Sequence, residues 1–236
     1  MDVTAHRLTL NERGWLALSA ADFGTALLDI CHWRQLDAGQ SLYFAGDPPG
    51  GIFGVASGAL LMSSGRAAPG AAPNRLAAVG DWSGFGPLMS QQPRRGSVAA
   101  SVPSVVGIAP LSAVLGLLRD HPNWWRHFGH GLLLEFDAVA DITVDLQMRD
   151  TAQRCAAILL HSAGCRHGPV PKTEEAIVRA SQENIAALAN MSRSTLAKVL
   201  TLFVQQNLVT LEYRSITLRD VPRLRLVADG ASEGGV

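Results

Sequence analysis

The sequence predicts an α+β protein with a strand-rich N-terminal part, a long helix and a mostly helical C-terminal part. Three observations predict this: Gly- and Pro-punctuated apolar runs between 34 and 109, a helical apolar repeat from 128 to 146, and a helix-turn-helix pattern between 181 and 208. The expected parts are 1–120 for a β-domain, 121–148 for the long helix and 149–236 for the C-terminal domain.

Composition excludes several protein classes. The 236 residues carry no net charge and are 47% hydrophobic, which provides for a core and argues against disorder. No apolar run reaches the roughly 18–20 residues that span a bilayer, and the N-terminus lacks the features of a secretory signal, so no membrane partner is expected. The three cysteines are odd in number and lack CxxC spacing, which predicts free thiols and a cytoplasmic location.

The N-terminal part is expected to be a β-sandwich or barrel that follows one short helix. Residues 19–33 predict that helix, with Ser19 as its N-cap. The segment 63–74, rich in Gly, Ala and Pro, predicts a loop between strands. The expected strands are the apolar runs 41–44, 51–55, 59–62, 76–79, 98–102 and 105–108.

The long helix carries an apolar stripe that one small domain does not need for its own core. We expect it to pack against a second copy of itself, as in a coiled coil. The alternative is a core helix that covers one face of the sandwich. The stripe residues expected at the dimer contact are Leu132, Phe136, Val139, Ile142 and Leu146.

The segment 181–208 fits a helix-turn-helix. Ser181 and Ser192 are expected to cap the two helices, Ala186 is small where the helices cross, and Asn190 tolerates the left-handed backbone of a tight turn. The second helix is expected to bury Leu196, Val199, Leu200 and Phe203. The runs 208–213 and 215–218 then predict a hairpin wing.

This pattern predicts binding to double-stranded DNA through the start of the second helix. Arg193 is suited to guanine edges, whereas Ser194 reads no particular base and Lys198 suits guanine or phosphate. The residues expected to serve backbone phosphates or the helix start are Thr195, Ser192, Ser181 and Arg214. The charge distribution is compatible with DNA binding by the C-terminal part, since residues 149–236 carry a net +3 and residues 1–148 a net −3. The alternative is a winged helix that binds a protein partner.

The order of these parts resembles the CRP/FNR (cyclic-AMP receptor protein) family of bacterial transcription regulators. The matching stretches are LDAGQSLYFAGDPPGGIFGVASGALLM, GDWSGFGPLMSQQPRRGSVAAS, the long helix and NIAALANMSRSTLAKVLTLFVQQNLV. The resemblance implies a jelly-roll domain like those that bind cyclic nucleotides, a dimerisation helix and a winged helix. It also implies a homodimer on a two-fold symmetric operator, with RNA polymerase as an expected further partner.

The family's cyclic-nucleotide pattern is broken in this chain. That pattern reads G-E-x-x-L and then R-[ST]-A, where the Glu takes the ribose hydroxyl and the Arg takes the phosphate. Here Gly84 is followed by Phe85 in place of the Glu, and Arg95 by Gly96 and Ser97. A lost charge-assisted hydrogen bond costs about 1.5–3 kcal/mol, so cyclic AMP is not the expected effector. Arg94 and Arg95 are left either to hold another anion or to be surface charge.

No cofactor is identified. Iron–sulfur members of the family need several N-terminal cysteines, and Cys31 stands alone there. Haem is not expected, although His121, His127 and His130 lie close together in sequence. No enzyme motif is present. The expected function is sequence-specific transcription regulation as a homodimer on a palindromic operator, with a non-classical or absent effector; the alternative is a ligand-sensing module whose winged helix binds a protein.

Overall fold

The computed structural model describes residues 2–64, 72–168 and 176–231. The chain divides into two compact units, one of residues 1–71 and 77–137 and the other of residues 72–76 and 138–236. We call them the N-terminal unit and the C-terminal unit. The expected loop 63–74 falls largely on residues outside the described ranges. No described helix combines the length and the apolar character needed to cross a membrane.

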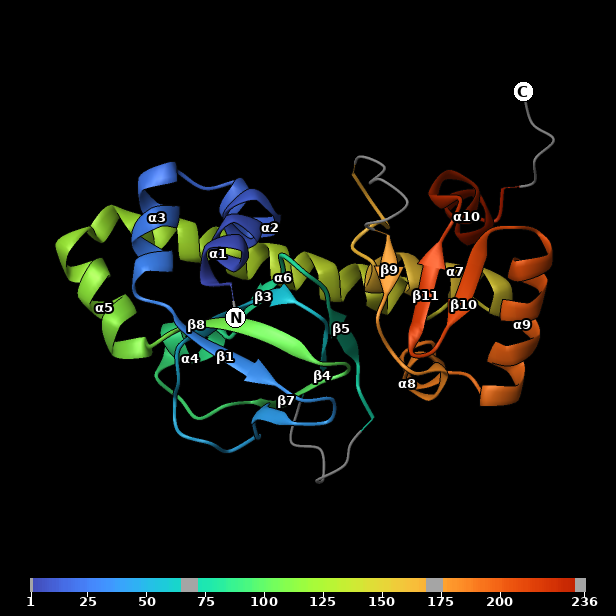
Figure 1. The fold of residues 1–236 in the computed structure, drawn as a ribbon, viewed down its shortest axis with the longest axis horizontal. Helices are drawn as coiled ribbons and strands as arrows, with labels where there is room; N and C mark the ends of the chain where they lie inside the picture. Colours follow the sequence, from blue (N-terminus) through green and yellow to red (C-terminus); the bar gives the residue numbers. More distant parts are fainter. Residues whose placement is uncertain (1, 65–71, 169–175, 232–236) are drawn as a thin grey trace. The chain divides into compact units, whose positions relative to one another are not determined.

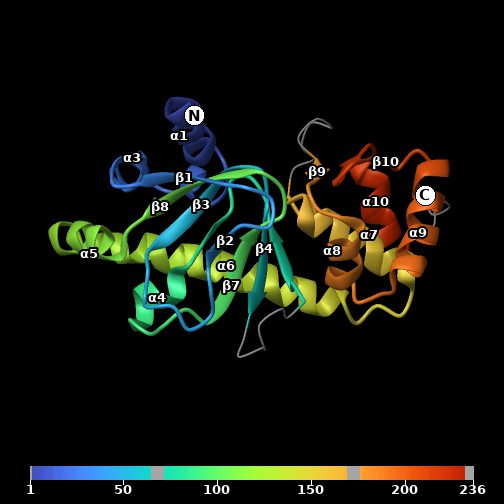
Figure 2. The same ribbon diagram turned by 60° about the horizontal axis from the view of Figure 1, so that its bottom comes forward.

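The N-terminal unit contains two four-stranded sheets, in the orders β1-β8-β3-β6 and β2-β7-β4-β5 (Figures 1 and 2). Neighbours such as β3 and β8, or β4 and β7, pair antiparallel, and side chains from both sheets form one core between them. The strands are β1 (His32–Leu36), β2 (Ser41–Tyr43), β3 (Ile52–Ser57), β4 (Leu60–Ser64), β5 (Arg75–Ala77), β6 (Trp82–Ser83), β7 (Gly96–Ala100) and β8 (Ser104–Ala109). This confirms the α+β class and the strand-rich N-terminal part.

A second core lies between the first sheet and the helices of this unit. At its centre the indole of Trp15 contacts the rings of Phe23, Phe85 and Phe128 at centroid distances of 5.5, 5.1 and 5.6 Å. The helices are α1 (Val3–Glu12), α2 (Gly14–Ala17), α3 (Ala21–Asp29), α4 (Phe85–Ser90) and α5 (Leu111–Asp120).

The first expected helix differs from the observed one at both ends. Helix α3 begins at Ala21 with Ala20 as its N-cap and no side-chain cap. Ser19 instead donates its hydroxyl hydrogen bond backwards to the carbonyl of Trp15 at 3.1 Å, at the end of the preceding α2, where that carbonyl also accepts from the Leu18 amide. The helix ends at Asp29, and the chain then enters β1.

The long helix is shorter than expected. After η1 (Pro122–Trp124), α6 runs from Trp125 to Asp145, so Leu146 follows its last residue and Phe128 is buried in the N-terminal core. Close packing explains a glycine in this helix: a Cβ on Gly131 would lie 2.6 Å from the Phe85 ring. The first turns of α6 thus cover the unit's own core, as the alternative expected, while the side chains of Leu132, Phe136 and Val139 are 38%, 66% and 45% exposed.

The described residues of the C-terminal unit form the end of α6, a three-stranded sheet in the order β10-β11-β9, and four further helices. Helix α7 begins directly after Asp150, whose side chain accepts hydrogen bonds from the amides of Ala152 and Gln153. The elements are α7 (Thr151–Ser162), β9 (Ile177–Val178), α8 (Gln182–Leu188), α9 (Arg193–Gln205), β10 (Val209–Glu212), β11 (Ser215–Leu218) and α10 (Val221–Ala228).

Candidate functional site

Helices α8 and α9 form the expected helix-turn-helix, and both expected caps are confirmed. The Ser181 hydroxyl accepts from the Asn184 amide at 3.2 Å, and the Ser192 hydroxyl accepts from the Thr195 amide at 3.1 Å. Between the helices, Asn190 has a φ of 48°, the left-handed conformation that asparagine tolerates better than most residues. The turn geometry therefore follows from local sequence.

Asn190 provides a direct test of this local control. Replacing Asn190 by alanine is expected to destabilise the C-terminal unit by about 1 kcal/mol, because a Cβ-bearing residue without a short polar side chain is disfavoured there. Replacement by glycine should cost less. The far-UV circular dichroism melt of the full chain measures the effect. Tryptophan fluorescence is the internal control, since Trp15, Trp33, Trp82, Trp124 and Trp125 all belong to the N-terminal unit.

The first turns of α9 present a polar outer face. Arg193, Ser194 and Lys198 are exposed and Thr195 is half-buried. On the inner face, Leu196, Val199, Leu200 and Phe203 are buried, as expected. Three of the predicted DNA-contact side chains are thus brought together on one accessible surface.

Ser192 and Thr195 are engaged within the protein. The Ser192 hydroxyl lies 2.9 Å from the hydroxyls of both Ser194 and Thr195. Their local role is therefore to fix the start of α9. Arg193 and Lys198 are the exposed cations on these turns.

The wing is the β10–β11 hairpin beside α9 (Figure 1). Arg214 lies in its two-residue turn with a φ of 53° and is exposed. The sequence interpretation missed Tyr213, which is 90% exposed and has the Arg214 guanidinium 5.7 Å from its ring centroid. The available signal in the sequence was a tyrosine directly before Arg214, at the predicted tip of the hairpin.

Arg154 of α7 supports the turn of the helix-turn-helix and was also missed. Its Nε donates to the carbonyl of Ala189 at 2.8 Å, and its Nη1 donates to the carbonyl of Met148 at 2.5 Å. Arg154 therefore joins the segment after α6 to the turn before α9. In the sequence it was only one of eleven basic residues in the C-terminal part.

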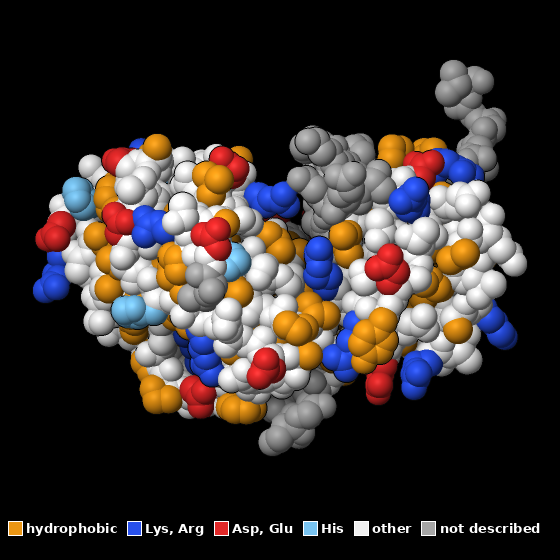
Figure 3. All heavy atoms as spheres, viewed as in Figure 1, with side chains coloured by type: hydrophobic (Ala, Val, Ile, Leu, Met, Phe, Trp, Pro, Cys, Tyr) orange, Lys and Arg blue, Asp and Glu red, His pale blue; other side chains and the backbone are white. Residues whose placement is uncertain are grey.

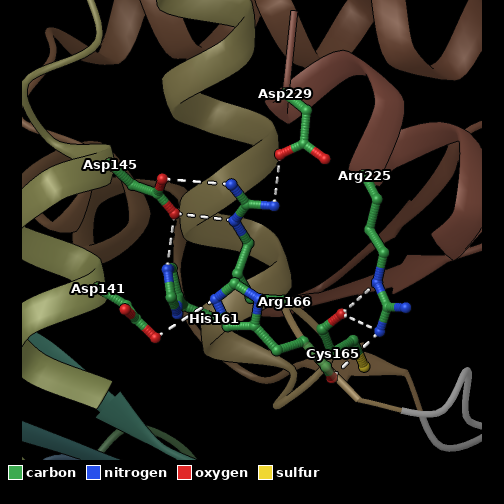
Figure 4. A network of polar contacts seen from close by, with 8 residues as sticks. Asp141, Asp145, His161, Cys165, Arg166, Arg225 and Asp229 are labelled. Atoms are coloured by element: carbon green, nitrogen blue, oxygen red, sulfur yellow. Dashed lines mark hydrogen bonds and ion pairs between the residues drawn. The ribbon is translucent and has the colours of Figure 1, made fainter. Parts of the chain in front are cut away.

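A polar network in the C-terminal unit centres on Asp145, the last residue of α6 (Figure 4). This carboxylate is 5% exposed and accepts from His161 Nε2 at 2.8 Å and from Arg166 Nε at 2.9 Å. Arg166 also pairs with Asp229, the C-cap of α10, at 2.8 Å. The end of the long helix is therefore bonded to α7 and, through Arg166, to α10.

Burial and hydrogen bonding act in opposite directions on this network. Burial alone raises the pKa of Asp145, but the hydrogen bonds from Arg166 and His161 outweigh it and hold that pKa below its ordinary value. Burial lowers the pKa of His161 despite its contact with Asp145. His161 is therefore a neutral hydrogen-bond donor to the carboxylate at neutral pH.

The residues that the family resemblance suggested for an effector pocket are spread over different surroundings. Phe85 is 1% exposed and packs into the helical core against Trp15, whereas Arg95 is exposed. Gly84 is the N-cap of α4, and Gly96 and Ser97 lie at the start of β7. The Ser97 hydroxyl accepts from the Ala45 amide at 2.9 Å.

A cavity of about 200 Å³ lies among residues of the β-sandwich. Both sheets and the loop between β2 and β3 contribute to it. Its arginines are Arg34 and Arg94, and Arg95 is not among its residues. The lining consists of Arg34, Leu42, Tyr43, Asp47, Pro48, Gly50, Phe53, Arg94 and Ile108.

Of the residues considered for cofactors, His121 and His127 stack on aromatic rings, Cys31 packs in the apolar core, and His130 is exposed. His127 stacks on Phe23 at 4.5 Å and His121 stacks on Trp124 at 4.0 Å. Burial raises the pKa of the Cys31 thiol to about 12, which disfavours the reactive thiolate. Within the described ranges, no three His, Cys, Asp or Glu side chains gather as a metal site.

Charge on the surface is mixed. On the face drawn in Figure 3, basic side chains lie at several separate places with acidic ones between them. This matches the zero net charge of the chain. The face drawn therefore offers no single broad basic surface for nucleic acid, and the exposed cations of α9 and the wing are individual residues.

Comparisons with known proteins identify the C-terminal unit first. Residues 153–227 match the Crp-like helix-turn-helix domain family. Over 191 residues the chain is 27% identical to the CRP-like cAMP-activated global transcriptional regulator of Mycobacterium tuberculosis, which covers 79% of this chain and 83% of that protein. The matched proteins are transcription regulators and not enzymes.

Solved structures agree on the fold. A putative cyclic nucleotide binding protein from Ruegeria pomeroyi is 20% identical with a TM-score of 0.69, covering 97% of this chain and 99% of that one. FixK2 from Bradyrhizobium japonicum is 16% identical with a TM-score of 0.69, covering 87% of this chain and 100% of that one. Residues 153–227 thus form a Crp-like helix-turn-helix domain, and in sequence and order of elements the chain is similar to transcription regulators of the CRP/FNR type.

Proposed function

We propose that this regulator binds double-stranded DNA in a sequence-specific manner, as a homodimer on a palindromic operator. The observation that carries the proposal is the outer face of α9, where Arg193, Ser194 and Lys198 are exposed opposite a buried apolar stripe. In helix-turn-helix proteins this part of the second helix enters the major groove. The exposed Arg214 at the wing tip adds a cation suited to a backbone phosphate.

The homodimer is supported by the exposed apolar side chains of α6. Leu132, Phe136 and Val139 recur at spacings of four and three, the repeat that pairs helices in coiled coils. Exposed side chains of this size in a row are typical of an interface. Two recognition helices related by a two-fold axis would then read half-sites about 34–36 Å apart.

An effector other than a cyclic nucleotide, or none, fits this chain better than cyclic AMP. The position of the family's glutamate is held by Phe85, which is buried in the helical core. That side chain carries no acceptor for a ribose hydroxyl. The relative from Mycobacterium tuberculosis is described as cAMP-activated, so the comparison calls for a direct test with cyclic nucleotides.

The test is selection of bound fragments from random DNA by the purified full chain, repeated with cyclic AMP and with cyclic GMP. We expect a palindrome to be enriched without nucleotide. A palindrome that appears only with a nucleotide would overturn the effector assignment. Salt titration separates the alternative function, because a DNA complex weakens steeply as salt rises. Absence of salt-dependent DNA binding in every condition would favour a winged helix that binds a protein.

Replacing Arg193 by alanine is expected to weaken operator binding by about 1–3 kcal/mol and to relax the preference at one G·C pair. The reason is that an arginine fork can satisfy both acceptors on a guanine edge. The measurement is the dissociation constant on the selected operator and on operators changed at each position.

The matched control is Arg214 replaced by alanine. As a phosphate contact, it should weaken all sequences equally and reduce the slope of affinity against salt by about one. An equal loss on every operator after the Arg193 change would make Arg193 a phosphate contact as well.

A further inference from the structure

The cavity of the N-terminal unit contains a buried cation that is not fully satisfied. Arg94 is 9% exposed, its Nη2 donates to the carbonyl of Gly51 at 2.7 Å, and its Cζ lies 4.1 Å from the centre of the Tyr43 ring. Its Nη1 has no hydrogen-bond partner among the residues that the structure describes. A buried guanidinium donor without an acceptor is destabilising, so such groups normally meet a ligand or water.

The charges around the cavity favour a ligand with one negative charge. Its ionised side chains are Arg34, Arg94 and Asp47, which sum to +1. The Asp47 carboxylate accepts from the Phe44 amide through Oδ2 at 2.9 Å, which holds its negative charge in the loop that lines the cavity. A doubly charged phosphate would leave an excess negative charge beside Asp47, whereas a carboxylate balances the site.

The apolar lining and the volume of the cavity limit the part of the ligand beyond its charged group to a short apolar body. Leu42, Phe53 and Ile108 offer apolar surface from both sheets. The volume of about 200 Å³ is below the roughly 300–1,000 Å³ of pockets for drug-sized ligands. We infer that this cavity binds a small monocarboxylate with a short apolar body, whose carboxylate is held by Arg94 and whose tail lies against the apolar lining.

This site differs from the one that the family pattern assigns to cyclic nucleotides. Phe85, Arg95, Gly96 and Ser97 do not line it. Gly84 is near the guanidinium, since a Cβ there would lie 3.0 Å from Arg94 Nη1. The two adjacent arginines have opposite surroundings, because Arg94 is buried and Arg95 is exposed.

The experiment uses the full chain without DNA, so its outcome is independent of the proposed DNA binding. Isothermal titration calorimetry is run with straight-chain monocarboxylates from acetate to hexanoate, with benzoate, with inorganic phosphate and with cyclic AMP. We expect saturable binding of at least one monocarboxylate. The same ligand should raise the tryptophan-fluorescence melting temperature of the N-terminal unit.

Two adjacent substitutions distinguish the proposed site. Arg94→Gln should weaken binding of the monocarboxylate at least tenfold, whereas Arg95→Gln should change it less than twofold. Arg34→Gln gives a second variant at an exposed lining position, and we expect it to weaken binding several-fold. The melting curve of Arg94→Gln without ligand reports whether the unit still folds. If the unit does not fold, the site is tested by the other two variants, of which Arg34→Gln should weaken binding and Arg95→Gln should not.

Several results would overturn the inference. The first is an absence of saturable monocarboxylate binding. The second is binding that is lost in Arg95→Gln but kept in Arg94→Gln and Arg34→Gln. The third is tighter binding of inorganic phosphate than of every carboxylate. If cyclic AMP bound more tightly than every monocarboxylate and this binding required Arg95, the effector site would lie at the position of the family pattern.

Discussion

Replacing Asp145 by alanine is expected to destabilise the C-terminal unit by about 3 kcal/mol. The carboxylate is 5% exposed and accepts hydrogen bonds from both His161 and Arg166. Removing one partner of a buried ion pair costs about 3–5 kcal/mol because the other charge stays buried. The lower end applies here, since Arg166 keeps its contact with Asp229 and His161 is neutral. The far-UV circular dichroism melt should shift while the tryptophan-fluorescence melt does not.

The chain offers a matched control one helical turn earlier. Asp141 also pairs with a histidine, His167, at 3.3 Å, but the two side chains are 48% and 64% exposed. Exposed pairs contribute about 0–1 kcal/mol, so Asp141→Ala should have little effect. Equal effects of the two substitutions would show that the Asp145 network does not stabilise this unit.

The same network sets a pH dependence. Because burial lowers the pKa of His161 in the folded state from its ordinary value of 6.5, the unfolded state binds more protons below that pH, and stability falls on acidification. The pKa of Asp145 is also held below its ordinary value of 3.8, so its contribution is present above that pH and is lost as pH falls through the lowered value. Asp145→Ala should remove the second of these losses.

The sequence predicted structure most accurately where a residue acts only on its own turn or helix end. Asn190 and Ser192 act on their own turn and helix start, so their spacing alone predicted the observed φ and cap. Gly- and Pro-punctuated runs likewise predicted most of the strands. Ser19 failed as a cap because the preceding α2 offered its hydroxyl another acceptor. The sequence interpretation had not predicted α2, and the carbonyl of Trp15 in that helix competes with the start of α3 for the Ser19 hydroxyl.

Buried polar groups that depend on distant partners were not predictable. Asp145 falls in a helix whose other acidic residues suggest a solvent face, and nothing in the sequence indicates that His161 and Arg166 approach it. The same holds for the two adjacent arginines, since only the fold shows that Arg94 is the buried one. Adjacent side chains in this segment point to opposite sides, so a shift of one residue decides which arginine is buried. The motif position of Arg95 therefore does not show which of the two arginines lines the cavity.

Placing a charge on the apolar stripe of α6 is the second change with a large expected effect. Phe136→Glu should convert the protein from dimer to monomer, because two carboxylates would face each other across a paired-helix contact. The Phe136 side chain is 66% exposed in the isolated chain, so folding should be unaffected. Affinity for a palindromic operator should fall by about 10²–10⁴, the gain that joining two binding modules provides, while affinity for a single half-site stays unchanged.

Val144 gives the control, because its side chain is 65% exposed on the same helix and lies about a third of a turn away from the stripe. Val144→Glu adds the same charge to an equally exposed apolar position, so it should leave both the mass in solution and the operator affinity unchanged. Sedimentation equilibrium and operator titration measure the pair. A Phe136→Glu protein that remains dimeric would place the interface elsewhere. If both variants became monomeric, the contact would extend around α6 beyond the stripe, and a simple two-helix coiled coil would no longer describe the dimer.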